Sequence, residues 1–322
     1  MIHLAWFLFC LGSVTAAGLD DGERIEFKSA NPFSFYHIIT DLDHQPIQDT
    51  YGILRFPNNP QQEPFPLVIG VNGSKNWADH HLEYLAMYRD MGFATFEPQS
   101  FNSRQVSSTV GEQVSVTTAM MILDVYRALE ILSRDDRIDE NNTAITGWSL
   151  GGGVALFSAW EPLIDAIGVD ARFAAHLSIY PPCLVDMDLI RFSPAPIHIL
   201  IGELDDWVTA SACEDLVSDL QDEDVNIAIT VYPNAHHGFD RQGPLARADR
   251  AYATGDCHFR MRADGALLMN FLNIPMTTPF RQKVALACCA KRGPTFGGNP
   301  EAREQSFLFA REFMHAHLID NE

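Results

Sequence analysis

The sequence predicts an α/β protein with a mostly parallel, doubly wound central sheet of about eight strands and helices on both faces. Two observations predict this architecture. Short apolar or β-branched runs alternate with segments of helical spacing, and crossover helices on both faces of a parallel sheet produce that alternation. One run, residues 66–71, is apolar without a break, which is typical of a strand buried on both faces.

The expected elements follow from local periodicity and from the turn residues between the runs. In chain order they are strands at 24–27, 51–56 and 66–71, a helix at 78–91, a strand at 93–96, a helix at 110–132, a strand and helix meeting near 148, strands at 177–180, 197–201 and 227–232, and a final helix at 304–318.

The N-terminal residues 1–17 have the features of a secretory signal peptide, an apolar run followed by small residues. The alternative is a buried N-terminal helix. Neither this run nor any other is long enough to span a bilayer. Residues 18–322 are about the size of one large α/β domain, and the protein is expected to be secreted or periplasmic.

The composition is acidic, with 42 Asp and Glu against 22 Lys and Arg. Such a chain repels nucleic acid and anionic membranes, so neither is expected as a partner. The sequence does not indicate an oligomeric state.

Five cysteines follow the signal segment, and an oxidising destination favours disulfides. We expect Cys183 to pair with Cys213, because both lie towards the carboxyl edge of the sheet on successive strand–helix units. Cys257 is then expected to pair with Cys288 or Cys289, which leaves one thiol free. The alternative is five reduced thiols in a protein without a signal peptide.

The strand–helix junction carries a Gly-x-Ser-x-Gly pattern, Gly147-Trp148-Ser149-Leu150-Gly151. A turn this sharp leaves no space for side chains at the two glycines, and it raises the serine hydroxyl above the sheet edge. Ser149 is therefore predicted to be a nucleophile. The alternative is an ordinary Gly-rich turn with a solvated serine.

A nucleophilic serine needs a base and an orienting acid, both from loops beyond the carboxyl ends of strands. Asp205 follows the 197–201 strand and is the expected acid; Asp206 is its rival, and the other of the two would cap the next helix. His237 follows the 227–232 strand and is the expected base. His236 is then a solvated or substrate-facing neighbour.

Two backbone N–H groups are expected to bind the oxyanion of the transition state. Leu150, directly after the nucleophile, is one donor. Ser74, in the loop after the 66–71 strand, is the other. This chemistry implies no metal and no organic cofactor.

These pieces together resemble the dienelactone hydrolase family of the α/β-hydrolase fold. The resemblance covers residues 65–240 and the final helix, and it rests on the loops at 71–74, 98–104, 147–152, 202–207 and 232–239. It implies Ser149 as nucleophile, Asp205 as acid and His237 as base.

Two positions depart from the family pattern: serine replaces the cysteine nucleophile of dienelactone hydrolase itself, and Asn72 replaces a usual histidine. The first departure puts the dienelactone substrate in doubt. Arg104 could bind a substrate carboxylate, as arginines do in the family, or form a structural salt bridge. Trp148, beside the serine, is a further candidate for substrate contact.

Residues 241–300, between the base and the last helix, are long for a connection and are explained least by the resemblance. We expect an insertion that forms a flap beside the active-site mouth; the alternative is a surface extension braced by a disulfide. The predicted function is hydrolysis of small carboxylic esters or lactones through an acyl-enzyme. Acyl transfer, small-peptide hydrolysis and a noncatalytic binding protein of the same fold are the alternatives.

Overall fold

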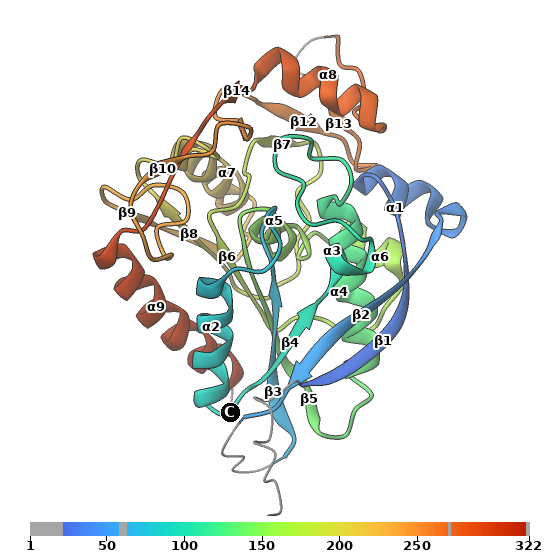
Figure 1. The fold of residues 1–322 in the computed structure, drawn as a ribbon. Helices are drawn as coiled ribbons and strands as arrows, with labels where there is room; N and C mark the ends of the chain where they lie inside the picture. Colours follow the sequence, from blue (N-terminus) through green and yellow to red (C-terminus); the bar gives the residue numbers. More distant parts are fainter. Residues whose placement is uncertain (1–21, 58–62, 270–271, 320–322) are drawn as a thin grey trace, which may run out of the picture.

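The computed structural model describes residues 22–57, 63–269 and 272–319, so the predicted signal peptide lies outside the described residues. Its centre is an eight-stranded sheet (Figure 1). The strands run in the spatial order β1 (Glu23–Ala30), β2 (Ile47–Arg55), β4 (Ala94–Pro98), β3 (Phe65–Val71), β5 (Ile138–Trp148), β6 (Ala175–Ile179), β8 (Ile197–Gly202) and β9 (Ile227–Tyr232).

The sheet is parallel from β4 to β9, and only β1 and β2 run antiparallel to their neighbours. Its central strand β3 lies between β4 and β5, with Val68 paired to Thr95 and to Ala144. The carboxyl ends of the parallel strands therefore meet along one edge. The predicted mostly parallel α/β sheet is confirmed.

Helices cover both faces of this sheet (Figure 1). On one face α2 (Asp79–Asp90) packs against α9 (Pro300–Leu318), and on the other α4 (Thr118–Leu132) packs against α5 (Leu150–Phe157). The remaining helices are α1 (Phe35–Asp41), η1 (Leu42–His44), α3 (Ser100–Ser103), α6 (Glu161–Ile167) and α7 (Ala210–Asp222), besides α8 described below. In the part of the chain that the structure describes, no helix combines the length and apolarity needed to cross a membrane.

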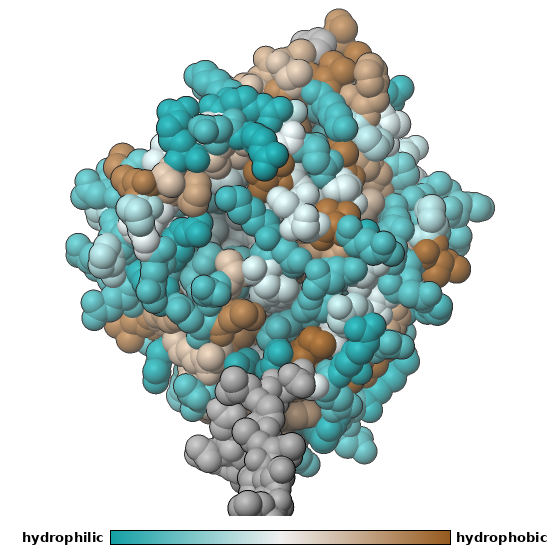
Figure 2. Space-filling view, in the orientation of Figure 1, coloured by the Kyte–Doolittle hydropathy of each residue, from teal (hydrophilic) through white to brown (hydrophobic). Residues whose placement is uncertain are grey.

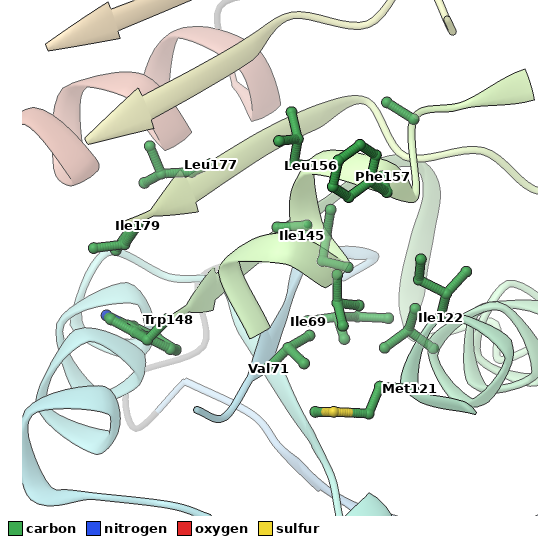
Figure 3. Packing of buried hydrophobic residues seen from close by; sticks show 14 of the residues in the cluster. Ile69, Val71, Met121, Ile122, Ile145, Trp148, Leu156, Phe157, Leu177 and Ile179 are labelled. Carbon is green, nitrogen blue, oxygen red and sulfur yellow. The ribbon is translucent and has the colours of Figure 1, made fainter. Parts of the chain in front are cut away.

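The core lies between the sheet and these helices, and Figure 3 shows part of it. Ile69 and Ile145, on neighbouring strands, pack with Ile122 of α4 and Leu156 of α5, and all four side chains are fully buried. The helix that follows Ser149 is therefore fixed against the sheet along its length.

Two helices begin elsewhere than periodicity predicts, and side-chain caps explain both. The helix expected from residue 110 begins at Thr118, because the Thr117 side chain accepts a hydrogen bond from the backbone N–H of Met120 and caps it. The final helix begins at Pro300 rather than at 304, because Asn299 accepts from the N–H groups of Glu301 and Ala302.

We call residues 241–299 the late segment. It forms short strand pairs rather than a coil: β10 (Ala246–Arg247) with β15 (Thr295–Phe296), β11 (Tyr252–Ala253) with β14 (Lys291–Arg292), and β13 (Leu267–Leu268) with β12 (Phe259–Met261), which also pairs with β7 (Val185–Met187). Its helix α8 (Pro279–Cys289) lies at one end of the molecule (Figure 1). Hydrophobic surface is visible at that end of the molecule (Figure 2). Leu272 and Phe280 of the late segment are exposed.

Two disulfides join these parts. Cys183 is bonded to Cys213, the pair expected from the sequence, with 4.9 Å between their Cα atoms. Cys257 is bonded to Cys289, one of the two alternatives left open, and Cys288 is exposed and free. The first bridge ties the loop after β6 to α7, and the second ties α8 to the strands of the late segment.

Candidate active site

Ser149 occupies the single position between β5 and α5 and has a strained backbone, with φ 56° and ψ −114°. Its N–H donates to the carbonyl oxygen of Ile179 at 2.9 Å. A Cβ at Gly147 would lie 2.1 Å from the carbonyl oxygen of Gly151, and one at Gly151 would lie 2.1 Å from that of Val71. Both glycines are therefore required for a turn this tight.

The serine, a histidine and a carboxylate form one line of contacts. His237 Nε2 lies 3.0 Å from Ser149 Oγ, and His237 Nδ1 lies 2.8 Å from Asp205 Oδ2. Asp205 and His237 are buried, with 3% and 5% of their surface exposed. This arrangement directs the Nδ1–H at the carboxylate and leaves Nε2 free to accept the serine proton.

Backbone groups hold the carboxylate in place. Asp205 Oδ1 accepts from the N–H groups of Trp207 and Val208, at 2.9 and 3.1 Å. The loop after β8 therefore fixes one oxygen and presents the other to His237.

Two aromatic rings enclose the imidazole of His237. The ring centroids of Tyr180 and Trp207 lie 4.6 and 4.7 Å from it. Tyr180 donates its hydroxyl to Asp240 Oδ1 at 2.9 Å, and Asp240 is fully buried. Burial, together with the neighbouring Asp240, raises the pKa of Tyr180 well above its ordinary value, so its phenol stays protonated. Neither residue stands in a recognisable motif, so the sequence does not indicate this pair.

Leu150 and Ser74 both lie at the cavity beside Ser149. Leu150 is the first residue of α5, where backbone N–H groups have no partner within the helix. Ser74 follows β3, and its loop is held by the hydrogen bond from Thr109 N–H to the Ser74 carbonyl at 2.9 Å. Asn72, which stands in place of a usual histidine, is buried and donates to the carbonyl of Gly73 at 3.0 Å.

Asp206, the rival acid, points elsewhere. It accepts a hydrogen bond from the N–H of Thr295 in the late segment at 2.7 Å. The expectation that the second aspartate caps the following helix is wrong, because α7 begins only at Ala210 and this carboxylate is used by the late segment.

Arg104 forms the structural salt bridge, one of the two roles left open. Its guanidinium binds both carboxylate oxygens of Asp124, at 2.7 and 3.0 Å, and donates to Asn31 Oδ1 and to the carbonyls of Ala30 and Ser100. The guanidinium is thus saturated by protein groups and does not line the cavity. The interpretation of Arg104 as a substrate ligand is not supported.

Trp148 and His236 also lie away from the cavity wall. Trp148 is fully buried and points towards α2, where its ring stacks on His81 with 4.6 Å between centroids (Figure 3). His236 is partly buried, and its Nδ1 has no hydrogen-bond partner among the described residues. The alternation of side chains along a strand explains why Trp148 points away from the cavity. Successive side chains point to opposite faces of the sheet, and Trp148 directly precedes Ser149 at the end of β5.

The cavity beside Ser149 has a volume of about 230 Å³. Its wall is mostly apolar and comes from widely separated segments. The apolar lining includes Phe33 and Phe35 before and in α1, Val116 and Ala119 around the start of α4, Leu184 and Val185 after β6, Trp207 and Val208 after β8, and Phe259, Met261, Leu267, Met276 and Leu286 of the late segment. The sequence predicts a flap near the mouth but indicates none of these lining residues.

The strand order, with a serine turn between β5 and α5 and the acid and histidine loops after β8 and β9, defines an α/β-hydrolase. The family model described as the dienelactone hydrolase family matches residues 57–261. That match covers more than half of the chain, so the protein belongs to the dienelactone hydrolase family. The resemblance noted from its loops is confirmed.

Solved structures agree on the fold. The structure entitled m3DLH has a TM-score of 0.57 at 15% identity, over 92% of this chain and 98% of that one. A putative dienelactone hydrolase from Klebsiella pneumoniae has a TM-score of 0.50 at 18% identity, over 68% and 89%. The dienelactone hydrolase-like promiscuous phosphotriesterase P91 from metagenomic libraries has a TM-score of 0.50 at 16% identity, over 68% and 86%. No curated protein matches the sequence.

Proposed function

We propose that this protein is a serine hydrolase that cleaves small carboxylic esters or lactones through an acyl-enzyme. The observation that carries the proposal is the line of contacts from Asp205 through His237 to Ser149, at 2.8 and 3.0 Å, ending on a serine held in a strained turn. A surface histidine beside an ordinary turn would not need a buried carboxylate behind it.

In this mechanism Ser149 Oγ attacks the substrate carbonyl carbon while His237 Nε2 takes the hydroxyl proton. Asp205 stabilises the imidazolium that forms. The negative charge passes to the carbonyl oxygen, which the N–H groups of Leu150 and Ser74 bind. When the tetrahedral intermediate collapses, the bond to the leaving alcohol breaks and His237 returns the proton to that alcohol.

Water then releases the acid by the same steps in the opposite sense. The water oxygen attacks the acyl carbon while His237 Nε2 takes a proton from that water. The bond between the acyl carbon and Ser149 Oγ then breaks, and His237 returns the proton to Oγ. No residue in the scheme needs a metal or an organic cofactor.

The experiment is covalent labelling with a fluorophosphonate probe together with turnover of p-nitrophenyl acetate. The wild-type protein is expected to be labelled at Ser149 and to release p-nitrophenol, and Ser149→Ala to lose both by several orders of magnitude while keeping its circular dichroism spectrum. Ser158→Ala, at the buried end of α5, is the matched serine control. An unlabelled wild-type protein without turnover would indicate a noncatalytic binding protein.

We also propose that the protein works outside the cytoplasm. Two disulfides, Cys183–Cys213 and Cys257–Cys289, support an oxidising compartment such as the periplasm or the extracellular space. Mass spectrometry of the mature protein would check the expected removal of residues 1–17.

A further inference from the structure

The wall of the cavity beside Ser149 contains no charged side chain among the described residues. Its polar members, such as Gln113, Thr117 and Gln282, are neutral. A neutral, mostly apolar wall favours an apolar group and makes the entry of a carboxylate costly, because a charge loses its hydration there without gaining a partner.

Three cationic side chains that could have paired with a substrate carboxylate interact with other parts of the protein instead. The Arg104 guanidinium is saturated by Asp124 and backbone carbonyls, as described above. Lys75 and Arg241 stack on the ring of Phe296, at 4.7 and 4.8 Å, and neither they nor that ring line the cavity. A negatively charged acyl group would therefore meet no counter-ion inside the cavity.

The size of the cavity limits what it can hold. A volume of about 230 Å³ has room for roughly seven or eight groups of the size of a water molecule or a methylene. That corresponds to an acyl chain of about six to eight carbons, or to a phenyl ring with a short spacer.

The late segment supplies one side of this cavity. Phe259 and Met261 of β12 and Leu286 of α8 are nearly fully buried, at 8%, 1% and 7% exposure, and all three line the cavity. The Cys257–Cys289 disulfide lies two residues before Phe259 and three after Leu286, so it holds these two parts of the wall together.

We infer that this cavity is an acyl pocket for neutral, apolar carboxylic esters of about six to eight carbons or with an aromatic acyl group, and that it excludes substrates with a carboxylate on the acyl part. The inference rests on the proposed serine-hydrolase function and names the substrate class of that site. The late segment is its specificity element.

The test compares three p-nitrophenyl esters: the acetate, the hexanoate and the monoester of the six-carbon dicarboxylic acid adipate. Hexanoate and adipate have the same length and differ in a terminal charge. The hexanoyl group has four more methylenes than the acetyl group, and each one that is buried is expected to raise kcat/KM by up to about fourfold, so hexanoate should exceed acetate by roughly tenfold to 250-fold. The adipate monoester should fall below acetate. Equal rates for hexanoate and adipate, or a preference for acetate, would overturn the acyl pocket.

A substitution in the cavity wall tests whether the preference among acyl groups arises in this cavity. Leu286→Arg places a cation on the cavity face of α8, and it should lower hexanoate turnover and raise adipate turnover relative to acetate. Phe280→Arg, on the same helix but 76% exposed, is the matched control and should leave all three rates unchanged. If Leu286→Arg does not fold, as judged by thermal unfolding, Leu286→Ala should still weaken hexanoate more than acetate. Identical ester profiles in wild type and Leu286→Ala would contradict the assignment.

A binding measurement separates this inference from the proposed function. In Ser149→Ala, which has no nucleophile, hexanamide should raise the midpoint of thermal unfolding while acetamide and adipic acid monoamide do not. If the wild-type protein hydrolyses no ester but the binding preference for hexanamide remains, the proposed hydrolase function is wrong and the apolar pocket is retained. Turnover without any preference among acyl groups or amides would reject the pocket alone.

Discussion

Asp206 accepts a hydrogen bond from the backbone N–H of Thr295 at 2.7 Å, so adjacent aspartates serve two different parts of the molecule. Asp205 faces His237, and Asp206 holds the late segment at β15. The loop after β8 thus connects the expected catalytic contacts to the wall of the cavity.

The two aspartates should differ sharply when each is changed to asparagine. Asp205→Asn is expected to lower kcat by roughly three to four orders of magnitude, because an amide does not hold the imidazole in the required tautomer. Asp206→Asn keeps an oxygen that accepts from Thr295, and its effect should stay within about threefold. Steady-state kinetics on p-nitrophenyl acetate would check this ranking, and a larger loss in Asp206→Asn would exchange the two roles.

The stability of the fold should fall at acid pH because of His176. This side chain is fully buried, with Nδ1 2.9 Å from the carbonyl oxygen of Ala155, and burial lowers its pKa to about 4. Its unfolded-state pKa is about 6.5, so the unfolded state binds the extra proton first as the pH falls. His176 therefore lowers the free energy of unfolding by about 3 kcal/mol as the pH falls from 6.5 to 4, and it causes no such loss above pH 6.5.

Chemical denaturation at several pH values would measure this loss. His176→Gln keeps an amide near Ala155 and has no titrating group, so its free energy of unfolding should fall less steeply over the same range. Parallel curves for the two proteins would mean that other groups control the acid limb.

The second disulfide should hold the cavity wall. Cys257→Ser is expected to destabilise the protein by about 3 to 4 kcal/mol in the chain-entropy description, because the bridge closes a loop between positions 32 residues apart. It should also reduce hexanoate turnover more than acetate turnover. Cys288→Ser removes the exposed free thiol beside the bridge and is the control for both measurements. Equal melting temperatures for the two variants would show that the bridge does not brace the wall.

The glycines of the serine turn should tolerate no side chain. Gly151→Ala sets a Cβ 2.1 Å from the carbonyl oxygen of Val71, a backbone atom that cannot move without shifting β3, and a cost above about 2 kcal/mol is expected. Gly153→Ala meets side-chain atoms alone, the ring of Pro182 at 3.2 Å and the methyl group of Thr118 at 3.8 Å, and should be far milder. Thermal unfolding of both variants would test the difference; a stable, active Gly151→Ala would contradict the geometry of the turn.

The sequence is most informative where the determinants of structure are local. The turn at Ser149 and the loops carrying Asp205 and His237 each follow a recognisable strand, and strand ends meet at one edge of a parallel sheet. The choice between Asp205 and Asp206 is not local in this sense. It depends on which carboxylate accepts hydrogen bonds from the N–H groups of Trp207 and Val208. Two adjacent aspartates in a sequence do not reveal which of them does so.

The cavity is the part that the sequence could not predict. Phe35, Ala119, Leu184 and Leu286 come from four distant segments, and each is an ordinary apolar residue in its own stretch. Only tertiary packing brings them together. Arg104 illustrates the opposite limit: the sequence identified the residue but not its partner, because Asp124 lies 20 residues further along the chain on α4 and only tertiary packing brings the two together.

The N–H of Gly298 donates to the carbonyl of Gly243 at 3.1 Å, so the late segment leaves and rejoins the body of the molecule at one place. Closing a chain whose ends already touch costs little more for a long segment than for a short one. Evolution or engineering can therefore lengthen, shorten or exchange residues 244–294 as a cassette while the sheet and the serine turn keep their positions. The contacts of Thr295 with Asp206 and of Gly297 with the carbonyl of His237 lie outside that cassette, so the substrate range can change without altering the loops that carry Asp205 and His237.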